Sequence, residues 1–130
     1  MHPNTRDYFD EQLEQVLGTM PPLVHQLLER IPLYVEDHPS AEILRKTGIR
    51  HKSALCGLYT GVPLSDRSVL HGGVPGDVVH LFRLGILNLA SNASGGLDPR
   101  ELQRQIRITL LHELGHHHGM SENDLEELGY

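Results

Sequence analysis

Three residues near the carboxyl end of this 130-residue chain, His112, Glu113 and His116, form an H-E-x-x-H motif. On a helix, residues four apart share one face, so both imidazoles can reach a single cation. Glu113 lies about 100° further round the helix than His112, outside the ligand set but close enough to hold and deprotonate a water molecule. This combination is typical of a zinc site that carries its own general base.

The residues around the motif place it on an amphipathic helix. Ile106, Leu110 and Leu114 recur on one face, whereas His112 and His116 fall on the opposite face. A helix with this division buries its apolar side in a core and leaves its polar side for chemistry.

A catalytic zinc site needs a third protein ligand and leaves a fourth position for water. Gly119 ends the helix and allows the chain to turn back, so Glu122, ten residues after His112, is our first candidate for that ligand. Asp124 is a second candidate. Both acids have an alternative structural interpretation, because the residues from Ser121 to Asp124 also resemble a helix-capping box.

The two histidines that follow His116 are not predicted to bind the metal. His117 and His118 fall on the apolar side of the helix, away from the ligand pair, and we interpret them as packed or partly exposed rings. Cys56 is the only cysteine, which excludes an internal disulfide and a multi-thiolate metal site.

Hydrophobic periodicity and turn residues predict an α+β fold. The long helix that carries the motif is expected to begin after the capping residue Asp98, with Pro99 in its first turn. The other expected elements are helices over residues 8–17, 22–29 and 40–44, strands over 31–36, 54–60 and 78–83, a helical turn over 86–89 and a mobile loop over 64–76.

The chain resembles the short bacterial zincin-like metallopeptidases, sometimes called minimal zincins, whose motif is HExxHxxGxxD. The resemblance rests on residues 8–13, 32–39, 55–67, 79–83 and 112–130. It implies a single domain over residues 1–130, with a small twisted sheet packed on helices and a central active-site helix. It also implies one Zn²⁺ ion and hydrolysis of peptide bonds by a metal-activated water, with Glu113 as the base. Glu122 stands where the family has Asp, and this departure bears on the geometry of the third ligand.

Zincins bind peptides in extended form along an edge strand above the motif helix. By resemblance, the strand expected to do this is residues 78–83, with Val78, His80 and Phe82 as substrate-binding residues. An ordinary interior strand is the alternative. Tyr130, the last residue, is a candidate support for the site, with a frayed terminus as its alternative.

Composition restricts the partners. The chain has 17 acidic and 11 basic residues and a net charge of −6, which argues against nucleic acid as the main partner. No stretch is apolar enough to cross a membrane and the first residues do not resemble a signal peptide, so we expect a cytoplasmic protein, monomeric or weakly dimeric, that acts on a peptide or protein. Iron, manganese or cobalt would also suit two histidines and a carboxylate.

Two other functions stay open. A catalytically silent interaction or regulatory module on a zincin scaffold would keep the fold without the reaction. A metal-dependent endoribonuclease can space its ligands in the same way, but such enzymes use three histidines and lack a glutamate at the position of Glu113.

Overall fold

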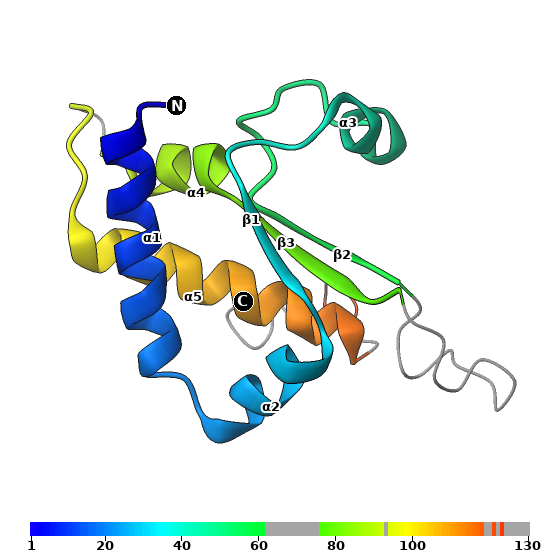
Figure 1. The fold of residues 1–130 in the computed structure, drawn as a ribbon. Coiled ribbons are helices and arrows are strands. Elements are labelled where there is room, and N and C mark those ends of the chain that lie inside the picture. Colours follow the sequence, from blue (N-terminus) through cyan, green and yellow to red (C-terminus); the bar gives the residue numbers. More distant parts are fainter. Residues whose placement is uncertain (62–75, 93, 119–120, 122, 124–130) are drawn as a thin grey trace, which may run out of the picture.

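The computed structural model describes residues 1–61, 76–92, 94–118, 121 and 123. Three strands form one mixed sheet in the order β1-β3-β2, and helices flank it (Figure 1). This arrangement confirms the predicted α+β fold. The elements in chain order are α1 (Pro3–Gly18), α2 (Pro22–Arg30), β1 (Leu33–Glu36), α3 (Ala41–Thr47), β2 (Gly57–Thr60), β3 (Val78–Phe82), α4 (Arg83–Ala90) and α5 (Pro99–His117).

The central strand β3 sets the two faces of the sheet. It pairs with β1 in parallel and with β2 in antiparallel orientation. Because successive side chains of a strand point to opposite faces, Val79 and Leu81 share one face and His80 lies on the other. Val79 and Leu81 are fully buried in the core, so their face is the one that meets the helices.

Helix α5 packs against most of the other elements that form the core. It contacts α1, α4, β2 and β3, and in Figure 1 it crosses behind α1 and continues beside the sheet. Within the described residues, no helix combines the length and the apolar character needed to span a membrane. The core consists of buried residues from α1, α2, β3, α4, α5 and their connections: Phe9, Leu13, Val16, Met20, Val24, Leu27, Ile31, Val79, Leu81, Ile86, Ala90, Leu102, Ile106, Leu110 and Leu114.

Several element boundaries differ from the sequence prediction for local reasons. Helix α1 begins at Pro3 rather than near Tyr8, because proline suits a first helical turn and the His2 imidazole caps it by accepting the Asn4 N–H at 3.0 Å. Arg83, expected to end a strand, begins α4 instead. The predicted helical turn over residues 86–89 is thus part of a longer helix.

An ion-pair network centred on the buried Arg83 connects α1 to the junction of β3 and α4. The Arg83 guanidinium donates to both carboxylate oxygens of Asp10, at 2.9 and 3.1 Å, and to Asp37 at 2.9 Å. Arg6 donates two further hydrogen bonds to Asp37, at 2.6 and 3.1 Å. The Arg83 charge also lies 5.9 Å from the centre of the Phe9 ring. The buried Arg83 charge needs such partners, because without them it would be desolvated and unpaired.

The network shifts the titration of Asp37. Hydrogen bonding and charge from Arg6, with a further contribution from Arg83, lower the pKa of Asp37 from 3.8 to about 2. Because the pKa is lower in the folded protein, the ionised carboxylate stabilises the fold above about pH 4. That contribution is lost as the pH falls toward 2.

We therefore predict that Asp37→Asn lowers the free energy of unfolding at pH 7 by about 1–3 kcal/mol, because Arg83 and Arg6 lose a charged acceptor. The variant should also lose less stability than the wild type between pH 4 and 2, by up to about 2 kcal/mol. Urea unfolding across this pH range measures both effects. Asp7→Asn, at an exposed position of α1, is the matched control and should keep the wild-type pH dependence. An Asp37→Asn profile parallel to that of the wild type would contradict the role of this carboxylate.

Candidate metal centre

Helix α5 carries the motif, and its two faces have different surroundings. Asp98 caps the helix by accepting the Arg100 N–H at 2.9 Å, and Pro99 occupies its first turn. Leu102, Ile106 and Leu110 are fully buried in the core. This burial fixes the rotation of the helix and turns His112 and His116 away from the core, as the sequence predicts.

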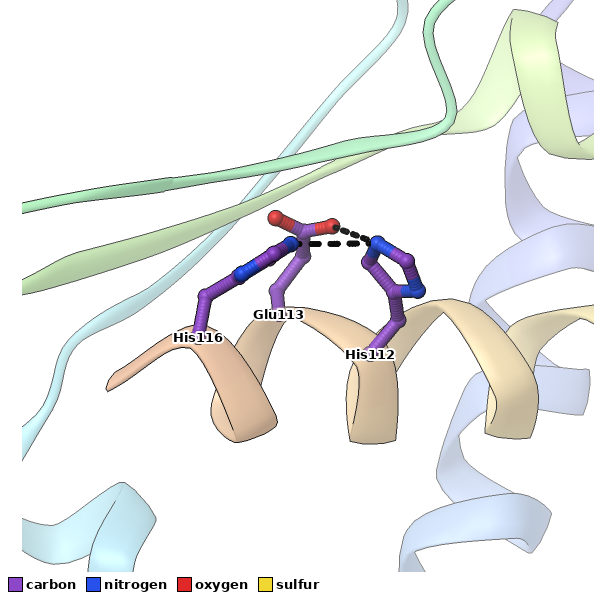
Figure 2. Close-up of side chains that lie close together, drawn as sticks. All are labelled: His112, Glu113 and His116. Carbon is purple, nitrogen blue, oxygen red and sulfur yellow. Dashed lines mark hydrogen bonds and ion pairs between the residues drawn. The ribbon is translucent and has the colours of Figure 1, made fainter. Parts of the chain in front are cut away.

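The structure brings His112, Glu113 and His116 together as predicted (Figure 2). The Nε2 atoms of the two imidazoles face each other 3.2 Å apart. A carboxylate oxygen of Glu113, Oε2, lies 3.9 Å from Nε2 of His112. One potential ligand atom from each residue lies within 4.8 Å of the others.

The spacing of the two nitrogens fits a metal ion. Two nitrogen ligands of a tetrahedral zinc ion, each about 2.05 Å from the metal, lie about 3.3 Å apart. The observed 3.2 Å separation of His112 Nε2 and His116 Nε2 is close to this value. Neutral imidazole is also a preferred zinc ligand, so both the geometry and the chemistry of the pair suit a divalent cation.

Glu113 is oriented by the sheet and not only by its own helix. The Tyr59 backbone N–H in β2 donates to Glu113 Oε1 at 2.9 Å, and the glutamate is only 8% exposed. With Oε1 held by this bond, Oε2 is the oxygen nearer His112. The carboxylate is thus fixed beside the histidine pair, which is where a general base has to stand.

In β2, the backbone N–H and C=O groups of alternate residues point away from β3 and toward the motif helix. The Phe82 N–H donates to the Cys56 carbonyl at 2.8 Å, which identifies Cys56 and Phe82 as a hydrogen-bonded antiparallel pair. Such pairs alternate along the strand, so the backbone groups of Gly57 and Tyr59 point away from β3. The bond from Tyr59 to Glu113 agrees with this pattern. Among the described strands, β2 therefore presents its outer edge to the motif helix.

Gly57 allows β2 and α5 to approach closely. A Cβ atom at this position would lie 2.7 Å from Cγ2 of Thr109 and 3.1 Å from Cγ of Glu113. Any larger residue would separate the strand from the helix. Sequence reasoning assigned no role to Gly57 or Tyr59, although a glycine within a predicted strand is a known sign of close backbone approach.

The predicted edge position of residues 78–83 is wrong. Strand β3 lies between β1 and β2, so its backbone hydrogen-bonding groups are used within the sheet. His80 lies on the face opposite the buried Val79, and its Nδ1 is 2.7 Å from Oε1 of Glu36. Val78 and Phe82 share that face by alternation. The assignment of Val78, His80 and Phe82 to substrate binding loses its basis, because it depended on a free edge at β3.

The neighbouring histidines are separate from the ligand pair, as expected. His117 is buried, and its Nδ1 lies 3.2 Å from Oδ2 of Asp77. His118 is exposed at the end of α5. The predicted third ligand Glu122, its alternative Asp124 and the candidate support Tyr130 lie outside the described residues.

Cys56 is a small residue packed beside the core. It is partly buried against the core. Burial and then the nearby charge of Glu113 raise the pKa of its thiol, so the sulfur stays protonated near neutral pH and is a poor metal ligand in that form.

Comparison with known families agrees with this geometry. The profile of the zincin-like metallopeptidase family matches residues 28–130, a span that contains the whole sheet and all of α5. A search of curated proteins found no match. Because the family match covers most of the chain and includes the H-E-x-x-H motif, this protein belongs to the zincin-like metallopeptidases.

Proposed function

We propose that this protein is a zinc-dependent peptidase that hydrolyses peptide bonds with Glu113 as its general base. The observation that carries the proposal is the arrangement of His112 and His116, whose Nε2 atoms face each other 3.2 Å apart beside a carboxylate fixed by β2. His112 and His116 would hold the metal, with Glu122 as the third ligand. A bound zinc ion would lower the pKa of a water molecule toward neutrality and polarise the scissile carbonyl.

The residues of the chain supply the proton transfers. Glu113 Oε2 accepts a proton from the attacking water and later donates it to the leaving amine, so the carboxylate ends the cycle as it began. The Tyr59 N–H holds Oε1 and prevents the side chain from rotating out of reach. Burial of Glu113 keeps bulk water from competing for this position.

The substrate backbone is proposed to bind along β2 rather than β3. Gly57 is buried against α5, so the backbone group of β2 proposed to meet the substrate is the outward carbonyl of Tyr59, which lies on the same edge as Glu113. An extended peptide paired with this edge would receive main-chain hydrogen bonds with little demand on its side chains. Its scissile bond would then pass close to the base.

We predict that Glu113→Gln retains the metal but lowers peptide cleavage by at least about a hundredfold, because the amide cannot accept the proton. His112→Ala should lose both the metal and the activity, because it removes a ligand. Elemental analysis of protein purified without metal-affinity chromatography and cleavage of a quenched fluorescent peptide library measure these properties. His25→Ala, on the exposed surface of α2, should change neither.

Two results would contradict this division of roles. Equal metal loss in Glu113→Gln and His112→Ala would place Glu113 among the ligands. A metal-loaded wild-type protein that cleaves no peptide in the library would favour a silent module on the zincin scaffold.

We also predict that Gly57→Ala reduces cleavage strongly while the histidine ligands keep their metal. The added methyl group would collide with Thr109 and crowd Glu113, moving β2 and the base apart. Overpacking of this kind costs about 1–3 kcal/mol of stability, so thermal unfolding should be measured together with activity. Gly18→Ala is the matched control, since a Cβ there meets nothing within 4 Å. Unchanged cleavage by Gly57→Ala would contradict the proposed role of this edge.

A further inference from the structure

A polar cluster next to the metal centre joins three separate parts of the chain. It consists of Tyr59 in β2, Asp77 immediately before β3, and His117 in α5, and we call it the Asp77 clasp. The Tyr59 hydroxyl donates to Oδ1 of Asp77 at 3.1 Å. The other oxygen, Oδ2, lies 3.2 Å from Nδ1 of His117. The side chains of Asp77 and His117 are only 12% and 6% exposed, so the contact is shielded from water.

Two residues of the Asp77 clasp, Tyr59 and His117, connect it to the metal centre. Tyr59 also provides the backbone N–H that holds Glu113 Oε1, at 2.9 Å. The Tyr59 ring meets the His117 ring edge-on, with centroids 5.7 Å apart. His117 directly follows the ligand residue His116. One strand residue is therefore linked both to the base and to the helical turn that carries a ligand.

The backbone around the clasp accommodates it closely. Gly61, which follows β2, has φ +140°, a conformation that residues with a side chain rarely adopt. A Cβ atom at Gly61 would overlap Oδ1 of Asp77 and lie 2.9 Å from its Cα and 3.0 Å from the Tyr59 hydroxyl. Only glycine leaves room at position 61 for the Asp77 carboxylate and the Tyr59 hydroxyl, so the clasp depends on this residue.

We propose that Asp77 is a positioning residue of the metal centre. Its carboxylate accepts the hydrogen bond from the Tyr59 hydroxyl and lies against the His117 ring, and so fixes the position of β2 relative to the last turns of α5 at Glu113 and His116. A catalytic effect of Asp77 rests on the proposed function. The positioning of Glu113 by Tyr59 does not, and it can be tested without metal or substrate.

The test is Asp77→Asn, which keeps the size of the side chain but removes its charge. Amide hydrogen exchange followed by NMR reports the bond from Tyr59 N–H to Glu113, and the Val79 amide, bonded to the Pro32 carbonyl at 3.0 Å, is the internal reference for the sheet. In the metal-free variant we expect the Tyr59 amide to exchange about tenfold faster relative to Val79. Zinc affinity, measured by competition with a chelator, should fall by about tenfold.

Two further variants separate positioning from general stability. Tyr59→Phe removes the hydroxyl that donates to Asp77, so the amide at position 59 should lose protection in the same direction as in Asp77→Asn, by a smaller factor. Asp37→Asn disrupts the ion-pair network around Arg83 instead, and should lower thermal stability without changing the relative exchange of Tyr59 or the zinc affinity.

Normal protection of the Tyr59 amide in Asp77→Asn would overturn the proposal. So would equal effects of Asp37→Asn on exchange and on zinc affinity, since the clasp would then be a contributor to stability only. If the proposed peptidase function is wrong, the metal-loaded wild-type protein will cleave no peptide. The exchange measurement on Asp77→Asn does not depend on that outcome.

Discussion

The close contact between β2 and α5 is the constraint on which the rest of the site depends. At Gly57 the strand lies against Thr109 and Glu113, and two residues later the Tyr59 N–H reaches the Glu113 carboxylate. A helix by itself presents Glu113 in many rotamers, because the side chain is long and flexible. The strand selects one of them. The residue proposed as general base is thus positioned jointly by two elements that are more than fifty positions apart in sequence.

The remainder of the fold supports this contact from both ends of the helix. The first half of α5 is buried against α1, whose apolar residues Phe9, Leu13 and Val16 belong to the same core. The family profile begins at residue 28, so α1 contributes core packing from outside the matched region. The ion-pair network of Arg83 attaches α1 to the end of the sheet. These interactions hold the helix and the sheet together far from the ligands, which leaves the polar end of α5 available for metal chemistry.

The Arg83 ion-pair network and the Asp77 clasp have different roles. Around Arg83, guanidinium and carboxylate groups pair bidentately and stabilise the packing of α1. Around Asp77, one carboxylate contacts a hydroxyl and an imidazole close to the metal centre. The first network bears on the stability of the fold, whereas the second lies where small displacements would change the distance between Glu113 and the edge strand.

Local features of the chain could be predicted from the sequence because they depend on neighbours within one or two helical turns. The cap at Asp98, the apolar stripe through Ile106 and Leu110, and the spacing of His112 and His116 all follow from helical geometry. The same helical periodicity predicted that His117 lies on the apolar side of the helix, apart from the ligand pair, and the structure buries it. The fold class also followed, since the pattern of helices and strands along the chain restricts how they can pack.

The sequence by itself determined that two imidazoles and a carboxylate would meet on one helix, because residues three and four apart must share a face. Only the tertiary structure decided which strand would face them. Strand order depends on pairings between distant segments, and the β-rich, apolar pattern of β3 is equally compatible with a central and an edge position. For that reason β3 could be mistaken for the edge, while the roles of Gly57 and Tyr59 emerged only when β2 was seen against α5.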